Sequence, residues 1–310
     1  MRLPVRPLLL AALLLFLVFG ETPDRTRFWK ELFNLGHAPL SGLLALIIRG
    51  WIANREGAAW RGAVARASVL AFIATVAIGS AVEALQVLQS DRNASWIDMG
   101  RNTAGAASFL LLREAAVRWL GGASGAARRT AWAAGLAGLA LLAGSGVGFA
   151  RTVSLYVERH RSMPTLFALD GSWWERELIE EEGSRLTPSA GLARLDLAPG
   201  KYPGLDFEEP YPDWRGYRTL ALTIVSDLDA PLTMTVRIHD ARHNRRLEDR
   251  FNRRLVVQPG ENTFRIPIDE IRRAPRGREM DLARIRGIMI FSGRLDHPTH
   301  VYLGPLRLEQ

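Results

Sequence analysis

The sequence of 310 residues contains no cysteine. This absence excludes a disulfide framework, thiolate zinc sites, iron–sulfur clusters and a cysteine nucleophile. The sequence also lacks a Gly-x-Ser-x-Gly elbow, a phosphate-binding glycine loop and a His-Glu-x-x-His zinc motif. We find no internal repeat and no low-complexity tract. The sequence therefore identifies no catalytic residue and no metal or cofactor motif.

An excess of acidic residues is also lacking, since the net charge is +8 and the pI is near 10.6. Such values are typical of nucleic-acid-binding proteins, so the location of the excess matters. Residues 1–150 hold 15 Lys and Arg against 8 Asp and Glu, whereas residues 151–310 hold 25 against 24. The mean hydropathy of 0.00 likewise averages two unlike halves. We expect two domains and no nucleic-acid partner.

Five apolar stretches occupy the first half, and each approaches the ~17–25 residues that cross a bilayer as a helix. They are Leu3–Phe19, His37–Ile52, Ala67–Leu88, Ile97–Leu112 and Ala131–Ala150. The first could instead be a cleaved secretory signal, because Arg2 and Arg6 precede its apolar run. Residues 1–150 are therefore predicted to form an all-α transmembrane bundle of about five spans that contacts the lipid bilayer.

The arginines predict the orientation of this bundle. The N-terminus and the connections around residues 49–66 and 113–129 are Arg-rich, whereas segments 21–36 and 89–100 have nearly balanced charges. Because short cytoplasmic loops carry the excess of Lys and Arg, the Arg-rich segments should be cytoplasmic. With five spans, everything after residue 150 should be extracytoplasmic.

The pattern of apolar residues changes after a juxtamembrane linker at residues 151–164. Short β-type runs separated by Pro, Gly and Asp follow, and 232–239 alternates apolar and polar residues. The predicted strands are Leu192–Leu197, Thr219–Ser226, Leu232–His239, Leu255–Gln258, Thr263–Ile268, Ile285–Ser292 and His300–Leu308. This pattern predicts an all-β sandwich, a jelly roll, over residues 165–310.

Polar residues gather where the third predicted span ends and the fourth begins. They are Glu83, Gln86, Arg92, Ser95, Asp98, Arg101 and Asn102. Spacings of three and four residues place Glu83 with Gln86 on one helix face, and Asp98 with Arg101 and Asn102 on another. A short loop makes the two helices antiparallel neighbours, so these faces can meet. The cluster is either a salt-bridged network that fixes the hairpin or an outward-opening pocket for a lipid head group or a lipid-linked precursor.

This spacing resembles the VanZ-like family of bacterial membrane proteins over about residues 20–120. The matching positions are Glu83, Gln86, Arg92, Ser95, Asp98, Asn102 and Gly105, and His37 resembles the family's histidine near the second span. The segment Ala38–Gly42 departs from the aromatic-rich stretch that often follows this histidine. The family is named for an association with teicoplanin resistance, and its molecular activity is not established. The resemblance implies a multi-pass protein of the bacterial inner membrane.

The second half resembles the galactose-binding-like jelly rolls of many carbohydrate-binding modules, over about residues 165–310. Sugar binding in such modules requires exposed aromatic rings and polar groups that bond hydroxyls. The candidate rings are Trp173, Trp174, Tyr202, Tyr211, Trp214 and Tyr217. Acidic corners such as Asp227–Asp229 could hold a structural calcium, although no dedicated loop is present. His239 and His243 should point apart because of strand alternation, so we expect no metal site there.

These patterns together indicate a non-enzymatic membrane protein of the cell envelope. Its outer module would bind envelope polysaccharide, peptidoglycan, a lipid-linked precursor or a partner protein. The alternative is a membrane enzyme acting on a lipid-linked precursor, with Glu83 or Asp98 as acid and base and with Arg92 and Arg101 holding a phosphate. A third interpretation is a pure scaffold.

Overall fold

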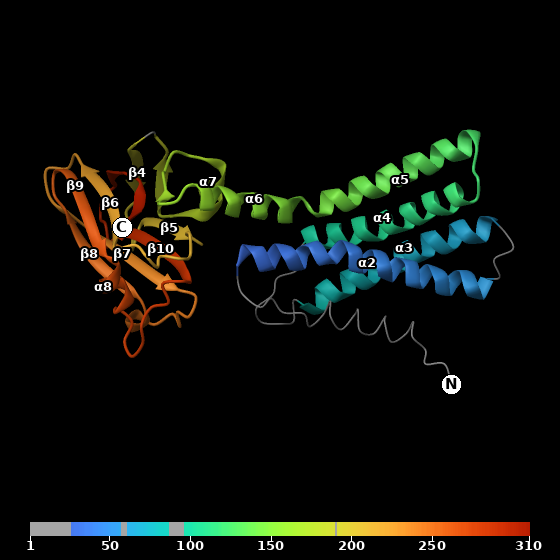
Figure 1. Ribbon diagram of the computed structural model, residues 1–310, viewed down its shortest axis with the longest axis horizontal. Coiled ribbons are helices and arrows are strands. Elements are labelled where there is room, and N and C mark those ends of the chain that lie inside the picture. Colours follow the sequence, from blue (N-terminus) through green and yellow to red (C-terminus); the bar gives the residue numbers. More distant parts are fainter. Residues whose placement is uncertain (1–25, 57–60, 87–95, 190) are drawn as a thin grey trace. The chain divides into compact units, whose positions relative to one another are not determined.

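The computed structural model describes residues 26–56, 61–86, 96–189 and 191–310 (Figure 1). The chain divides into two compact units, Met1–Val153 and Ser154–Gln310. The first is helical and the second is a β-sandwich. The predicted span Leu3–Phe19 lies outside the described residues, as do Arg92 and Ser95.

The helical unit consists of α2 (Arg27–Glu56), α3 (Arg61–Gln86), α4 (Trp96–Leu120), α5 (Gly125–Ser145) and the start of α6 (Val147–Arg161). Helix α4 packs against α2, α3 and α5. Small residues allow the close approach, because a Cβ at Gly105 of α4 would overlap the backbone of Ala38 in α2. At a second crossing, the Ser108 hydroxyl donates to the carbonyl of Gly138 in α5 at 2.7 Å.

Two of the described helices are long and apolar enough to cross a membrane, namely α2 over Arg27–Asn54 and α3 over Ala65–Leu85. Helices α5 and α6 together supply a third candidate if this pair, bent by 46°, is one span. Helix α4 fails the criterion because Asp98, Arg101, Arg113, Glu114 and Arg118 interrupt its apolar residues. The described residues thus hold two or three candidate spans, and the predicted stretch Ala131–Ala150 is broken at Gly146.

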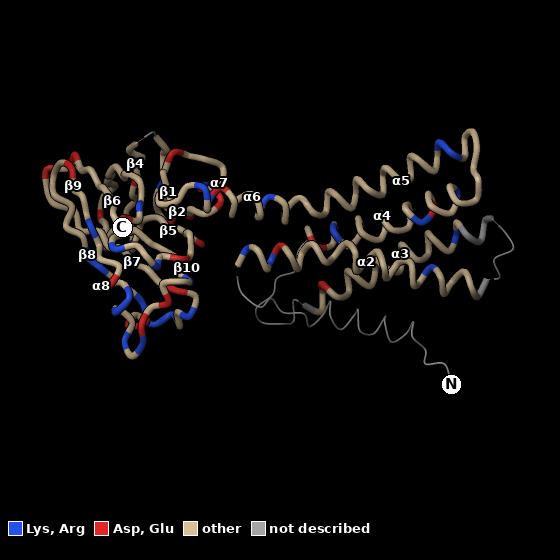
Figure 2. Tube along the Cα trace, in the orientation of Figure 1, with Lys and Arg blue, Asp and Glu red and all other residues tan. Residues whose placement is uncertain are grey.

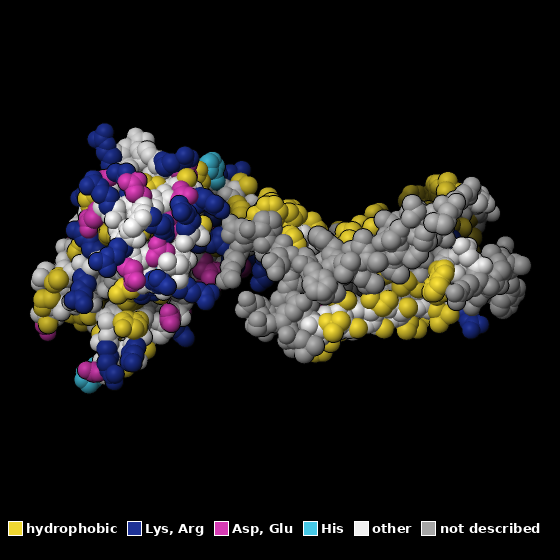
Figure 3. Space-filling view, turned by 90° about the horizontal axis from the view of Figure 1, so that it is seen from below, with side chains coloured by type: hydrophobic (Ala, Val, Ile, Leu, Met, Phe, Trp, Pro, Cys, Tyr) yellow, Lys and Arg dark blue, Asp and Glu magenta, His cyan; other side chains and the backbone are white. Residues whose placement is uncertain are grey.

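Hydrophobic side chains cover much of the visible described surface of the helices, whereas charged side chains cover the sandwich (Figure 3). On α3, Ile73 is 57% exposed, and on α5, Leu139 is 55% exposed. Exposed apolar surface of this kind is typical of helices that face lipid.

The sandwich consists of two antiparallel sheets. The seven-stranded sheet has the order β1 (Thr165–Phe167), β12 (Leu306–Glu309), β6 (Thr219–Ser226), β11 (Thr299–Leu303), β4 (Ala193–Leu197) and β3 (Ser184–Thr187), with β9 (Gly260–Pro267) on the other edge of β6. The five-stranded sheet has the order β2 (Ile179–Glu182), β5 (Gly204–Glu208), β10 (Ile285–Ser292), β7 (Leu232–Asp240) and β8 (Phe251–Val257). Short helices α7 (Trp173–Leu178) and α8 (Ile268–Arg272) and the 3₁₀ turn η1 (Leu247–Asp249) complete it.

Alternation along each strand decides which side chains enter the core between the sheets. In β7, Met234, Val236 and Ile238 are fully buried, whereas Arg237 and His239 turn to the outer face. The predicted strands 219–226 and 285–292 are observed with the same bounds. The predicted strand 300–308 is two strands, β11 and β12, interrupted at Gly304 and Pro305.

The segment 151–164, expected to be a linker, is helical as far as Arg161. Its second half belongs to the sandwich unit, because Leu155 is buried in the sandwich core. The Tyr156 hydroxyl donates to the Glu209 carboxylate at 2.5 Å, and the Arg159 guanidinium donates to the Glu209 carbonyl at 2.6 Å. These contacts join the end of α6 to the segment after β5.

Candidate functional sites

Asn102 of α4 connects three helices. Its Oδ1 accepts a hydrogen bond from the Ser41 hydroxyl at 2.7 Å and lies 3.2 Å from Nδ1 of His37, both on α2. On α3, Gly79 lies against the same side chain, with its missing Cβ position 3.3 Å from the Asn102 amide nitrogen. Because Asn102 is only 6% exposed, these contacts offset the cost of burying its amide oxygen.

An ionic group lies one turn away. The Arg101 guanidinium contacts the Asp98 carboxylate at 2.7 Å and the Glu31 carboxylate at 3.2 Å. Glu31 also accepts from the Asn34 amide at 3.0 Å. Glu83 of α3 is 3% exposed and follows Gly79, which lies against Asn102, by four residues, so it lies one helical turn away on the same face. We name the residues Glu31, Asn34, His37, Ser41, Glu83, Asp98, Arg101 and Asn102 the polar cluster.

The polar cluster contains five of the eight residues predicted for this site, namely His37, Glu83, Asp98, Arg101 and Asn102. The side chain of Gln86, together with Arg92 and Ser95, lies outside the described residues. Sequence reasoning missed Glu31, Asn34 and Ser41. Their spacing with His37 is three, three and four residues, which is the helical-face signal that could have found them.

Two of the six predicted sugar-binding rings lie in the sandwich core, and three more pack against it. Trp214 is completely buried, and its indole N–H donates to the Tyr211 carbonyl at 2.7 Å. Trp174 is 7% exposed and stacks on Phe167, with ring centroids 5.8 Å apart. Rings in these positions cannot stack on a sugar, so for these two the prediction is corrected. Trp173, Tyr211 and Tyr217 are half-buried and pack against the same core. Tyr202 remains, at 58% exposed.

Tyr202 lies at the outer face of the five-stranded sheet. It precedes β5 in the left-handed conformation, with φ of 61°. Its ring meets Phe291 of β10 edge-on, with centroids 5.7 Å apart. The Arg237 guanidinium of β7 lies 4.8 Å from the centroid of the same Phe291 ring and 3.1 Å from the Met289 sulfur. The exposed Tyr202 ring and the Arg237 guanidinium thus both contact the Phe291 ring.

Asp206 completes this arrangement, on the opposite side of β10. Met289 is paired in register with both Asp206 of β5 and Arg237 of β7, so the carboxylate and the guanidinium flank it. Within the described part of the chain, the Asp206 carboxylate accepts no hydrogen bond and the Arg237 Nε donates none. Burial, together with the nearby Glu208 and Glu180 charges, raises the pKa of Asp206 to about 6. We name Tyr202, Asp206, Arg237, Met289 and Phe291 the sheet site.

His239 lies on the same face, over Gly287 of β10, where a Cβ would overlap its ring. Its ring centroid is 5.0 Å from that of His243, so the prediction that strand alternation separates the two rings is wrong. The turn after β7, in which the His243 N–H bonds the Asp240 carbonyl, brings His243 back. Burial and His243 lower the pKa of His239 to about 4. Among the described residues, no group of three or more His, Cys, Asp or Glu could hold a metal ion.

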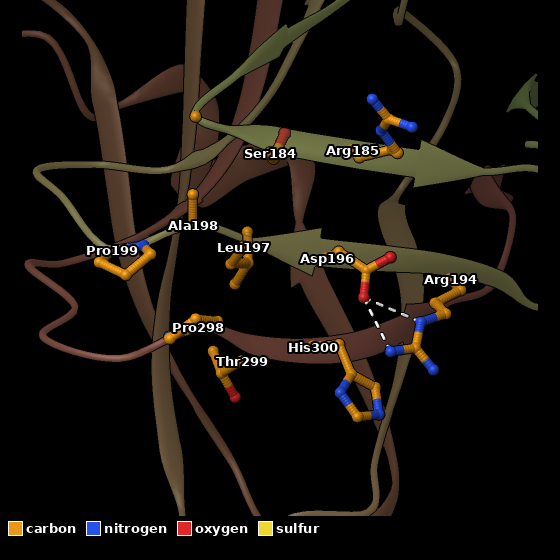
Figure 4. A pocket seen from close by; sticks show the side chains of 11 residues that line it. Ser184, Arg185, Arg194, Asp196, Leu197, Ala198, Pro199, Pro298, Thr299 and His300 are labelled. Carbon is orange, nitrogen blue, oxygen red and sulfur yellow. Dashed lines mark hydrogen bonds and ion pairs between the residues drawn. The ribbon is translucent and has the colours of Figure 1, made fainter.

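The outer face of the seven-stranded sheet carries a hollow of about 530 Å³ where β3, β4 and β11 adjoin (Figure 4). Arg194 and Asp196 pair with each other across its wall at 2.8 Å. His300, also in the wall, bonds Asp227 of the predicted acidic corner at 2.9 Å. Because these polar groups already bond one another, they offer a ligand less than the sheet site does.

No family model matches the chain, and no curated protein matches it either, so the VanZ-like resemblance gains no support from these comparisons. Solved structures resemble the β-sandwich. A family 11 carbohydrate-binding module from Clostridium thermocellum is 12% identical, covering 42% of this chain and 83% of the module, with a TM-score of 0.34. A family 29 module from Piromyces equi is 10% identical, covering 42% and 78%, with a TM-score of 0.30.

An agarase is 17% identical over 47% of this chain, with a TM-score of 0.38. The matched part is 26% of the agarase, about a quarter of its length. These similarities cover only the sandwich half of the chain. The described residues comprise helices, of which two or three are candidates to span a membrane, and a sandwich of two antiparallel sheets.

Proposed function

We propose that this chain is a membrane-anchored glycan-binding protein whose sheet site holds the sugar. The observation that carries the proposal is an exposed Tyr202 ring that contacts the same Phe291 ring as Arg237, with the half-buried Asp206 across Met289 from Arg237. A pyranose has an apolar face, which stacks on a flat ring, and hydroxyls, which both donate and accept hydrogen bonds. Asp206 supplies hydrogen-bond acceptors and Arg237 supplies donors. The sheet site therefore offers a ring for the apolar face of a sugar and polar groups for its hydroxyls.

The half-burial of these groups supports the same conclusion. A wet sheet face normally leaves its charged side chains extended into water, where they bond solvent. At the sheet site, water is partly withdrawn from a carboxylate and a guanidinium, which lie on either side of Met289 instead of pairing directly. Hydrogen bonds to a ligand are stronger in such a medium of low dielectric constant, so the arrangement is prepared for hydroxyl groups.

The helices supply the anchor. We propose that the chain crosses a bacterial inner membrane five times, through the predicted first span, α2, α3, α4 and the bent pair of α5 and α6, so that the sandwich lies outside the cytoplasm. Helix α4 would cross by packing against α2, α3 and α5. The exposed apolar residues of α3 and α5 support this placement. Attachment to the membrane raises the effective concentration of the sandwich near envelope polysaccharide, peptidoglycan or lipid-linked precursors.

The test uses the full chain, purified in detergent, in affinity electrophoresis through gels that contain soluble mixed-linkage β-glucan, dextran or galactan. We expect at least one polymer to retard the chain, and Tyr202→Ala to weaken that binding about tenfold through loss of ring stacking. Tyr302→Ala is the matched control, because Tyr302 also meets its neighbour, His300, edge-on at 5.7 Å, but on the other sheet. Equal losses in the two variants, or no retardation by any polymer, would contradict the proposal.

The polar cluster supports a second candidate function, the binding or processing of a lipid-linked precursor. Carboxylates and an arginine lie together there on neighbouring helices, and ionisable side chains in membrane helices are rare without a role. Glu83 or Asp98 would act as acid or base in an enzymatic version. Glu83→Gln and Asp98→Asn separate the roles by measuring phenotype and abundance together. Lost phenotype at normal abundance favours ligand binding or chemistry, whereas low abundance means that the network held the fold.

A further inference from the structure

Charge is segregated within the sandwich. Residues 241–279 hold 11 basic residues, all arginine, against 6 Asp and Glu, whereas the rest of residues 151–310 holds 14 basic against 18 acidic. Figure 2 shows basic residues gathered around α8 and the loops beside it. A nearly neutral domain therefore presents one end with an excess of five positive charges. We name residues 241–254 and 269–279 the arginine-rich end.

Only some of these arginines are neutralised by neighbouring carboxylates. Arg253 pairs with Glu270 at 2.9 Å, and Arg272 pairs with Asp269 and Glu279. Arg273 also pairs with Asp269. Arg278 pairs with Asp240 and Asp249. Six arginines of this end form no ion pair with the described part of the chain, namely Arg242, Arg245, Arg246, Arg250, Arg254 and Arg276. Guanidinium groups in this state present their fork of N–H donors to carboxylate, sulfate or phosphate groups.

The arginine-rich end is hollowed and rigidly held. A cavity of about 970 Å³ lies between η1 and α8. Its wall carries Arg250, Arg273 and Arg276 together with the acidic residues Glu248, Asp269 and Glu270, so the excess of positive charge lies on the arginines around the cavity. Arg278, in the loop after α8, connects this loop to the end of β7 and to η1. Its guanidinium contacts Asp249 at 2.6 Å and Asp240 at 2.6 and 2.9 Å. Asp240 is 1% exposed, so Arg278 is committed to this internal contact. The remaining arginines are thereby presented on a preorganised surface, which reduces the entropy lost on binding.

The arginine-rich end continues from the sheet site across β8. Arg237 of the sheet site is paired in register with Asn252, and Arg254 lies two residues further along the same face. We propose that the glycan held at the sheet site is anionic, and that its carboxylate, sulfate or phosphate groups bind the arginine-rich end. This inference rests on the proposed function. A lipid surface fits less well, because the end is concave and Leu247 is its single exposed large apolar side chain.

The test measures binding of the full chain in detergent to alginate, a polyuronate, and to neutral mixed-linkage β-glucan at two salt concentrations. The variant carries Arg245→Gln, Arg246→Gln and Arg276→Gln. The control carries Arg185→Gln, Arg218→Gln and Arg307→Gln, which remove the same charge from the seven-stranded sheet and its rim. We expect alginate to bind, more weakly at high salt, and the variant to lose about tenfold in affinity while the control keeps it.

Each other outcome overturns the inference in a distinguishable way. Equal losses of alginate affinity in the variant and the control would mean that alginate binding depends on net charge alone. Binding to neutral β-glucan without binding to alginate would leave the sheet site standing and refute an anionic ligand. Binding to phosphatidylglycerol vesicles in place of alginate would assign the arginine-rich end to a lipid surface. Binding to no glycan would refute this inference and the proposed function together.

Discussion

Asp206 lets the proposed function be tested through stability, because its charge is unfavourable in the free sandwich. Burial raises the pKa of its carboxyl from 3.8 to about 6, so the folded chain binds this proton more tightly than the unfolded chain does. The ionised side chain therefore destabilises the fold above pH 6. The penalty falls as the pH drops from about 6 to about 4, and it is absent below the pKa of the unfolded chain. Asp206→Asn removes the charge and keeps the shape.

The size of the effect follows from the shift. The pKa of Asp206 differs by about two between the folded and the unfolded chain, which corresponds to a free-energy penalty on folding of about 3 kcal/mol at pH 8. Solvent screening of the exposed part of the side chain reduces this penalty to about 1–2 kcal/mol. For a unit of the size of Ser154–Gln310, the expected rise in melting temperature is about 3–8 °C. At pH 4 the variant and the parent should unfold at nearly the same temperature.

The assay is thermal unfolding of the full chain in detergent, followed by tryptophan fluorescence at pH 8 and pH 4. Asp229→Asn, at an exposed aspartate between β6 and β7, is the matched control and should change stability by less than about 0.5 kcal/mol. A melting temperature at pH 8 that stays unchanged or falls in Asp206→Asn would refute the reasoning. An equal gain at both pH values would also refute it, because the gain would then not come from ionisation.

Two further predictions concern packing. Trp214→Phe leaves the Tyr211 carbonyl without its donor and opens a cavity, so thermal unfolding should show a loss of about 2–4 kcal/mol. Glycan affinity per folded molecule should not change, and a specific loss of affinity would restore Trp214 as a binding residue. Gly105→Ala should destabilise the helical unit by about 1–3 kcal/mol, because its Cβ would overlap the Ala38 backbone. Gly100→Ala, on the same helix with no atom within 4 Å of its Cβ position, should be neutral or stabilising.

The strands that could be predicted from sequence are those in which period-two alternation runs for several residues, such as β6 and β7. The strands β1, β2 and β3 have three or four residues each, too few for a period to stand out, and β2 reads Ile-Glu-Glu-Glu. Their pairing is decided by neighbours distant in sequence, as when Glu180 of β2 aligns with Asp206. Helix α4 was predicted as a span, yet its charged residues serve contacts within the helical unit.

Site residues divide in the same way. Spacings of three and four residues placed Asp98, Arg101 and Asn102 on one face, because helical geometry alone fixes that relation. Aromatic residue type could not distinguish Tyr202 from Trp214, since burial depends on packing between two sheets. Asp206 was not predicted at all. Its role comes from the registers of three adjacent strands, which place it across Met289 from Arg237.

The unfavourable charge of Asp206 connects stability with function. A sequence with no use for this carboxylate would gain stability by replacing it with a neutral side chain, as Asp206→Asn is expected to show. If the carboxylate accepts hydrogen bonds from sugar hydroxyls, the same substitution should weaken glycan binding while it raises the melting temperature. Opposite signs for stability and affinity are expected of a binding residue, whereas a residue that only supports the fold should move both in the same direction. Measuring both quantities on one variant therefore separates a ligand site from an incidental polar patch.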